Sequence, residues 1–488
     1  MSVSETSTSG RAVILTSYRT HLSGTQRLGS PGYSYDVVAG LLAPLLQRWG
    51  EVMPVPLDVH RIEDAIRTAR QRGLQPIHLS VLPFQDVYLT ASAPNVVFPF
   101  WEFPDVPAEA FDGNPQNNWV ATANRCDLVL VCGPFTAESL RRAGIRTPIH
   151  VVPVPTPREY FVLPSWSPDT VTRIPCSAYV FPNPAVPGHE LWDAADAVDE
   201  DGPRLQPPAP SLARSLLGQL RLAYRHVLKP LLPPVVHQAA RTRVRPVGVG
   251  LDRWHEYLHS CRHEHLELSG IVFTSIFSPQ DGRKNREDLL SGFVTALRDR
   301  ADATLVVKLV SADSLWIESA LNYYRTTGLS HRCKVIFITD YLPDEQLCAL
   351  AGASTYYLTT TRAEGCCLPL LNYLAAGRPG VAPCHTAISD YFGPELGFVI
   401  RSSLERTLWP QDRRIRFKTT WHRLMWPSVV EQIRRSYELA RNDRASYEAL
   451  AAAARSRMTQ WVEAEAVWPR LRDALDTLNL RRFTTLVA

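Results

Sequence analysis

The sequence predicts an α/β protein in which one chain carries two doubly wound domains. Short apolar segments typical of buried strands alternate with helical patterns between residues 12 and 152. The alternation stops, and it resumes between residues 271 and 382. A chain of 488 residues is also too long for a single core. Ligands bind such domains at the carboxyl ends of the strands, so we expect a site in the cleft between the two halves.

The first half opens with a strand, a glycine-bearing loop and a helix. The loop covers residues 23–32 and contains Gly29 and Gly32, and the helix over 34–48 is expected to kink at Pro44. The expected strands of this half are 12–16, 77–81, 95–100, 128–131 and 149–152. The expected helices are 34–48, 62–72, 115–125 and 137–143. The first domain is therefore predicted to cover residues 1–158.

Residues 159–265 break this rhythm and are predicted to be a proline-rich insertion or linker. An acidic stretch contains Asp199-Glu200-Asp201, a D-x-D pattern that either holds a divalent metal or belongs to a solvated linker. The segment 211–229 is predicted to be a basic amphipathic helix. That helix either packs on the first domain or lies on an anionic membrane, which gives an expected peripheral membrane contact.

The second half, residues 266–455, repeats the alternation. The expected strands are 271–277, 304–310, 334–338, 355–358 and 380–382. The expected helices are 286–300, 314–326 and 344–352. From Trp421 the chain is expected to be helical, and residues 456–488 form a tail that packs back on the first domain through Trp461 and Trp468.

The stretch 361–383 carries the clearest functional signal. Glu364 and Gly365 make a turn after a strand, Pro369 suits the first helical position, and Gly377 ends the helix. The backbone N–H groups of Cys366, Cys367 and Leu368 then lie at a helix N-terminus. Unpaired donors and the positive end of the helix dipole coincide there, so we expect an anion site.

Bulk properties exclude several classes of protein. The net charge of +4 is too small for this length to indicate nucleic acid as a partner. Nine irregularly spaced cysteines indicate reduced thiols and a cytoplasmic protein. The polar N-terminus lacks the pattern of a signal peptide, and no apolar run reaches the length of a membrane span.

Several segments resemble one family. EGCCLPLLNYLAAGRPGVAP, at 364–383, is similar to the signature E-G-x-G-L-P-x-x-E-A-x-A-x-G-x-P-V-V-A of retaining glycosyltransferases of family four, which have the GT-B fold. GRKNREDLLSGF, from Gly282, looks like that family's donor-diphosphate segment, and VIFITDYLPDEQLCAL, from Val335, looks like its nucleotide-base segment. NVVFPFWEFPDVP, from Asn95, looks like a W-E variant of bacterial members. Segments 127–144 and 151–161 look like the end of the family's first domain.

The resemblance implies a role for each matching residue. Arg283 and Lys284 would neutralise the donor diphosphate, together with the backbone from Gly365 to Leu368. Glu364 would face the hydroxyl groups of the donor sugar, and Tyr341 would lie beside the nucleotide base. Gly32 would let the donor phosphate approach the first domain.

Glu102 is expected to orient the acceptor or the donor sugar, or otherwise to cap its own loop. Cys366 and Cys367 are interpreted as small filling residues. The family implies no protein nucleophile, since the leaving diphosphate itself is thought to take the acceptor's proton on the same face. It also implies no metal and no cofactor beyond the nucleotide sugar.

Two positions depart from the family's pattern. Asn372 stands where a second Glu normally pairs with the nucleotide ribose. The loss of that charge-assisted contact costs about 1–3 kcal/mol. Pro279 stands where the usual Arg precedes the Lys by five residues, and the neighbouring Arg283 is the candidate substitute.

The leading hypothesis is a metal-independent retaining hexosyl- or other glycosyltransferase of polysaccharide biosynthesis. It would act on a glycan or a lipid-linked or protein-linked acceptor. The alternatives are a weak or silent GT-B protein that binds a sugar nucleotide or glycan, and a sugar-nucleotide epimerase of the same fold. Asn372 and the missing Arg motivate the silent binder.

Overall fold

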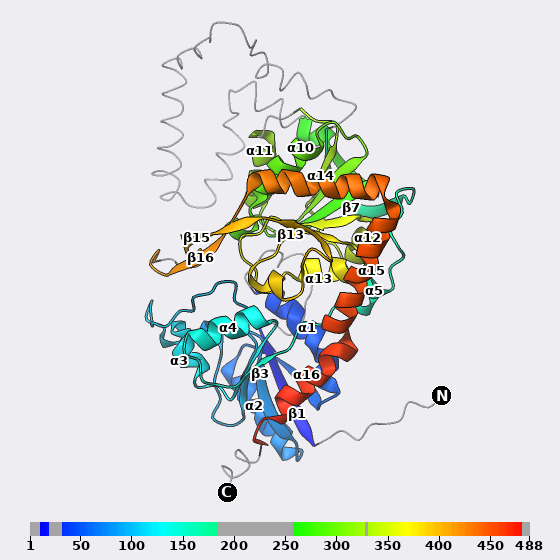
Figure 1. Cartoon of the computed structure of the whole chain (residues 1–488). Coiled ribbons are helices and arrows are strands. Elements are labelled where there is room, and N and C mark those ends of the chain that lie inside the picture. Colours follow the sequence, from blue (N-terminus) through cyan, green and yellow to red (C-terminus); the bar gives the residue numbers. More distant parts are fainter. Residues whose placement is uncertain (1–9, 19–31, 183–256, 327–329, 413, 481–488) are drawn as a thin grey trace, which may run out of the picture. The chain divides into compact units, whose positions relative to one another are not determined.

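The computed structural model describes residues 10–18, 32–182, 257–326, 330–412 and 414–480 (Figure 1). The described residues of Met1–Pro182 and His263–Ala488 belong to one compact unit, which contains two α/β halves. One half holds a six-stranded sheet and the other an eight-stranded sheet. The predicted architecture of two Rossmann-like sheets, the GT-B arrangement, is confirmed.

The first sheet is entirely parallel, in the order β2-β1-β3-β4-β5-β6. Its strands are β1 (Arg11–Ser17), β2 (Glu51–Pro56), β3 (Gln75–Ser80), β4 (Asn95–Val97), β5 (Leu128–Val131) and β6 (Ile149–Val151). The helices are α1 (Tyr33–Gln47), α2 (Val59–Gln71), α3 (Trp119–Ala123), α4 (Pro134–Arg142) and α5 (Arg158–Phe161). All predicted strands of this half are present. Strand β2 escaped prediction because Pro54 and Pro56 are typical of a non-strand, and an edge strand tolerates them.

The predicted strand 95–100 ends earlier, at Val97. Pro99 has no N–H to continue a ladder, so the chain leaves the sheet there. The loop that follows carries Trp101 and Glu102 past the carboxyl end of the sheet, and Trp101 is buried.

The second sheet has the order β14-β13-β12-β9-β10-β11-β7-β8. Its strands are β7 (Thr172–Phe181), β8 (Arg262–Leu268), β9 (Ile271–Phe277), β10 (Ala303–Leu309), β11 (Lys334–Ile338), β12 (Tyr356–Leu358), β13 (Gly380–Pro383) and β14 (Gly397–Ile400). Strand β7 is antiparallel to β11 and lies inside the segment predicted to be a linker. Pro175 and the mixed polarity of the strand gave no periodic signal, so the sequence prediction missed it.

Residues that follow β9 and β12 lie at a topological switch point. From β11 to β14 the order of the parallel strands is third, second, first, fourth, fifth and sixth along the chain. The order reverses between β9 and β12, and a crevice opens at the carboxyl ends of such a pair. Arg283 and Lys284 follow β9, and Glu364 follows β12. The topology therefore brings these three residues together.

Helices cover this sheet and then cross to the first half. They are α10 (Arg286–Leu297), α11 (Ser314–Thr326), α12 (Asp344–Ala353), α13 (Leu368–Ala375), α14 (Trp426–Asn442), α15 (Arg444–Trp461) and α16 (Ala464–Asp476). The last helix returns to the first half, where Glu465 pairs with Arg48 at 2.9 Å. The Arg48 guanidinium also lies 4.6 Å from the Trp468 ring. Trp468 is therefore an anchor of the tail, as predicted.

A two-stranded hairpin follows the second sheet. Strands β15 (Ser402–Leu408) and β16 (Lys418–Leu424) pair antiparallel and project from the second half beside the first (Figure 1). The prediction that the chain is helical from Trp421 is therefore wrong at its first residues, since α14 begins at Trp426. Strand β16 contains Thr419, Thr420 and Trp421, which are β-branched and aromatic residues enriched in strands.

Two earlier predictions lie outside the described residues, namely the D-x-D pattern at 199–201 and the helix at 211–229. Among the helices that the structure describes, none is both long and apolar enough to cross a membrane.

Candidate functional site

The site centres on two ion pairs at the switch point. The Lys284 ammonium lies 2.5 Å from the Glu364 carboxylate, whose side chain is only 6% exposed. Both residues sit on loops at strand ends, Lys284 in a short 3-10 turn after β9 and Glu364 in the turn after β12. Two sequence-predicted residues 80 positions apart thus meet as a buried pair.

Arg283 joins the two halves of the chain. One terminal nitrogen donates to the Ala363 carbonyl at 2.7 Å. The other donates to Asp281 at 2.7 Å and lies 3.3 Å from Glu102, which comes from the first half. Its Nε is buried and has no partner among the described residues. The guanidinium therefore keeps one donor free at the site.

Charge compensation sets the protonation of this cluster. Burial raises the pKa of Glu102, and the nearby Arg283 only partly offsets that effect. Burial alone would lower the pKa of Arg283, but the carboxylates of Asp281, Glu102 and Glu364 raise it overall. Burial would also lower the pKa of Lys284, and Glu364 raises it. The five side chains comprise three carboxyl groups and two cations, so the two cations cannot offset the charge of all three carboxylates.

Helix α13 presents unused backbone donors beside these ion pairs. It begins at Leu368, so Pro369 is the second helical residue rather than the first. Within the described chain, the N–H groups of Gly365, Cys366, Cys367 and Leu368 donate no hydrogen bond. Free donors at the positive end of a helix suit an anion. The predicted anion site therefore has the donors that it needs.

Backbone strain gathers around the same place. Asn285, Cys367 and Thr386 are left-handed, with φ of 51°, 61° and 50°. This conformation is unusual for a residue with a side chain, above all for a β-branched one, and such strain clusters at functional sites. The Thr386 hydroxyl accepts the N–H of Glu364 at 3.0 Å, so the strained turn holds the carboxylate-bearing residue in place.

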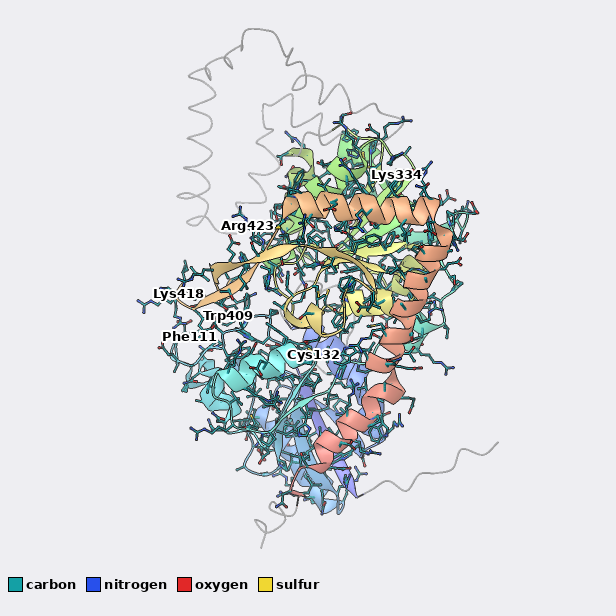
Figure 2. The ribbon with its side chains drawn as sticks, in the orientation of Figure 1. Phe111, Cys132, Lys334, Trp409, Lys418 and Arg423 are labelled. Carbon is teal, nitrogen blue, oxygen red and sulfur yellow. The ribbon has the colours of Figure 1, made fainter. Side chains whose placement is uncertain are left out.

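The two halves touch closely around Gly365. A Cβ at this glycine would lie 3.2 Å from the Trp101 backbone, so a side chain there would force the backbone of Trp101 to shift. The Cys132 thiol donates to the Gly365 carbonyl at 2.7 Å, and Figure 2 shows Cys132 at the border of the halves. Asp390 accepts the Phe135 N–H at 3.1 Å and so caps helix α4 of the first half. The two halves are thus in direct contact at Gly365 and at Asp390.

The thiols near the site are unreactive by their environment. Burial raises the pKa of Cys367 to about 12. A hydrogen bond with Cys132, followed by burial, raises the pKa of Cys366 well above its usual value. A thiolate nucleophile is disfavoured there. This agrees with the interpretation of Cys366 and Cys367 as filling residues.

Tyrosines surround the start of helix α1. Gly32 is the N-cap of this helix, and a Cβ there would collide with the Tyr18 ring at 2.6 Å. Burial raises the pKa of the next residue, Tyr33, to about 12, with a smaller contribution from Tyr341.

Asn372 has a partner of its own. Burial raises the pKa of Tyr160, and a hydrogen bond from Asn372 partly offsets that effect. The amide at the position of the expected ribose-binding Glu therefore lies near Tyr160 of α5.

Sequence reasoning missed Asp281, Thr386 and Asp390. Asp281 accepts the Arg283 N–H at 3.1 Å and caps the 3-10 turn, and its place two residues before Arg283 was an available signal. Thr386 and Asp390 belong to a 3-10 helix (Thr386–Asp390) after β13, and no pattern in the sequence marked it.

No protein-family model matches this chain, and no curated protein matches it. Among solved structures, Alr3699/HepE from Anabaena, in complex with UDP and glucose, is similar with a TM-score of 0.51. The identity is 11%, and the match covers 96% of this chain and 100% of that one. The same protein in complex with UDP-glucose matches with a TM-score of 0.50 and 10% identity, at the same coverage. Sucrose-phosphate synthase from Thermosynechococcus elongatus matches with a TM-score of 0.51 and 11% identity, covering 96% of this chain and 98% of that one. At these identities the likeness establishes the fold.

Proposed function

We propose that this chain is a glycosyltransferase that moves a sugar from a nucleoside-diphosphate donor to a glycan or a lipid-linked or protein-linked acceptor. One observation carries the proposal. The two cations Arg283 and Lys284 lie near four backbone N–H groups at the start of α13 that donate no hydrogen bond within the described chain. Preorganised donors of this kind stabilise the negative charge that develops on a departing diphosphate. The UDP and UDP-glucose complexes of the similar HepE protein make UDP-glucose the first donor to test.

Binding of the donor would replace ion pairs that exist within the protein. Its diphosphate would replace the carboxylates of Glu102 and Glu364 on the two cations, and Arg283 Nε would gain its missing acceptor. Glu364 would then be free for the sugar hydroxyls, and Glu102 for the acceptor or the sugar. These are the roles that the resemblance implies. Retention of configuration and independence of metal belong to the same proposal.

The cytoplasm is the proposed compartment, because nine cysteines without disulfide bonds suit a reducing environment.

A donor panel tests the proposal. Purified protein is incubated with nucleotide sugars and acceptors, and released nucleoside diphosphate is measured with and without a chelator. We expect turnover that falls by about 10²-fold or more in Glu364→Ala. Glu448→Ala, which removes an exposed partner of Arg444, serves as the control and should match the wild type. Equal rates in wild type and Glu364→Ala with every donor would refute the proposal, and an inverted anomer in the product would refute retention.

A second candidate is a sugar-nucleotide-binding protein with little or no turnover. It is favoured by Asn372, which stands in place of the expected Glu, and by the ion pairs of Arg283 with two carboxylates. The variant Asn372→Glu separates the two candidates. Tighter donor binding with turnover supports the enzyme, whereas donor binding without turnover in either form supports the binder. Sugar isomerisation without an acceptor would instead indicate an epimerase.

A further inference from the structure

The β15–β16 hairpin has two unlike faces. The pairing of Leu408 with Lys418 places alternate residues of both strands on one face. On the inner face, Trp409 lies 5.4 Å from Trp101 of the first half, measured between ring centroids. Figure 2 shows Trp409 near Phe111, and Lys418 at the outer margin of the hairpin. The outer face and the tip form what we name the hairpin surface: Leu404, Arg406, Leu408, Ile415, Arg416 and Lys418.

Large apolar side chains are concentrated on this short segment. Ten such side chains are exposed in the described parts of the chain, and five of them lie between residues 404 and 426. Leu404 and Ile415 are each 70% exposed. These exposed side chains do not belong to the packed core. Their clustering indicates a surface that a binding partner covers.

The tip residue adds an independent observation. Ile415 has a φ of 55°, a left-handed conformation that a β-branched residue rarely adopts. Asn or Gly would suit this position without strain. A strained and exposed isoleucine brings no benefit to the fold, and backbone strain of this kind is kept where a function needs the side chain.

The net charge of the hairpin is positive, whereas the net charge of the remaining chain is slightly negative. Residues 401–426 contain seven arginines and lysines but only two acidic residues, a formal charge of +5. The whole chain carries +4, so the other residues together carry −1. Among the described residues, Arg406, Arg416 and Lys418 make no ion pair. Unpaired cations therefore lie beside exposed aliphatic side chains.

We propose that the hairpin surface docks on an anionic phospholipid membrane. Cations attract acidic headgroups, while Leu404, Leu408 and Ile415 enter the boundary between headgroups and acyl chains. Aliphatic side chains favour lipid over a glycan or a single-stranded nucleic acid, because those two ligands need aromatic rings for stacking. The proposal concerns where the protein is held, and it does not depend on the proposed function.

Vesicle flotation tests this proposal with the full chain. Wild type is mixed with vesicles of phosphatidylcholine alone or with added phosphatidylglycerol, and the bound fraction is measured. We expect binding only to the anionic vesicles. The double variant Arg406→Glu/Lys418→Glu should bind about tenfold or more weakly, because each cation near the surface contributes to affinity. Ile415→Asp should bind at least about fivefold more weakly.

Two matched controls isolate the hairpin. Arg61→Glu reverses an exposed charge on α2, and Val162→Asp changes an apolar side chain that is 68% exposed elsewhere. Both should bind as the wild type does, and circular dichroism should show that all variants fold. Full binding by the hairpin variants would overturn the proposal, even if the chain binds vesicles through another segment. Equal binding to neutral vesicles, or binding to an anionic polysaccharide in place of vesicles, would also overturn it.

Discussion

The Glu102 carboxylate of the first half lies 3.3 Å from the Arg283 guanidinium of the second half. This pair joins the two halves through the same cation that is proposed to bind the donor diphosphate. The pairing of Glu102 with Arg283 and the binding of the donor are therefore competing uses of one side chain.

Removing the charge of Glu102 should favour nucleotide binding. In Glu102→Gln we expect about threefold to tenfold tighter binding of UDP, because a competing negative charge is gone. Turnover should nevertheless fall if Glu102 also orients a substrate. Isothermal titration calorimetry measures the affinity, with Glu109→Gln as an exposed control nearby. Burial raises the pKa of Glu102, so UDP binding to wild type should take up a proton and weaken as pH rises. Unchanged affinity in Glu102→Gln would contradict the competition.

The contributions of Asp281 and Arg283 to the free energy of unfolding should be coupled. Arg283→Ala leaves buried carboxylates without a partner, so the free energy of unfolding should drop by about 3–5 kcal/mol. Asp281→Asn removes one charge-assisted bond and should cost about 1–3 kcal/mol. The double variant should lose less than the sum of both, as urea denaturation would show. Additive losses would mean that the pair at 2.7 Å contributes nothing through its own contact.

Asp390 should make stability depend on pH. Burial raises the pKa of Asp390 from 3.8 to about 6, and the Phe135 N–H offsets this only in part. Below the unfolded-state pKa both states are protonated, and above pH 6 the folded protein holds a poorly solvated carboxylate. The free energy of unfolding should therefore fall as pH rises between these values. Relative to wild type, Asp390→Asn should gain about 1–2 kcal/mol at neutral pH, after allowance for partial exposure, and nothing near pH 4. Thermal melts of both proteins across this range check it, and parallel curves would contradict it.

The reactivity of the thiols should show whether the two halves stay in contact. Seven of the nine cysteines are buried, Cys348 is half-buried and Cys384 is exposed. Cys384 should react first with a thiol reagent, and Cys348 more slowly. Cys132, Cys366 and Cys367 should react only when the halves separate or the chain unfolds. Mass spectrometry of alkylated peptides at neutral pH gives the order. Early labelling of Cys132 would show that the cleft opens readily without a ligand.

The sequence was sufficient to predict two α/β halves, because β1, β9 and β10 are rich in apolar residues and their helices follow the helical period, but it missed β2, β7, β8 and β14. The meeting of Lys284 with Glu364 also followed from the order of motifs along the chain. Asp390 could not be inferred in the same way, since it acts on Phe135, a neighbour that only the folded chain provides. The hairpin was missed because its inner face, with Trp409 and Phe417, packs on the other half and not on a sheet of its own.

The indoles of Trp101, Trp119 and Trp409 are an intrinsic spectroscopic probe of the contact between the two halves. Trp101 and Trp119 come from the first half, with ring centroids 4.6 Å apart, and Trp409 reaches them from the second. Closely spaced aromatic rings held at fixed angles produce strong near-ultraviolet circular dichroism, and that signal depends on their separation. Any motion that draws the hairpin away from Trp101 will therefore change the spectrum, so hinge opening can be timed in a stopped-flow instrument without attaching a dye.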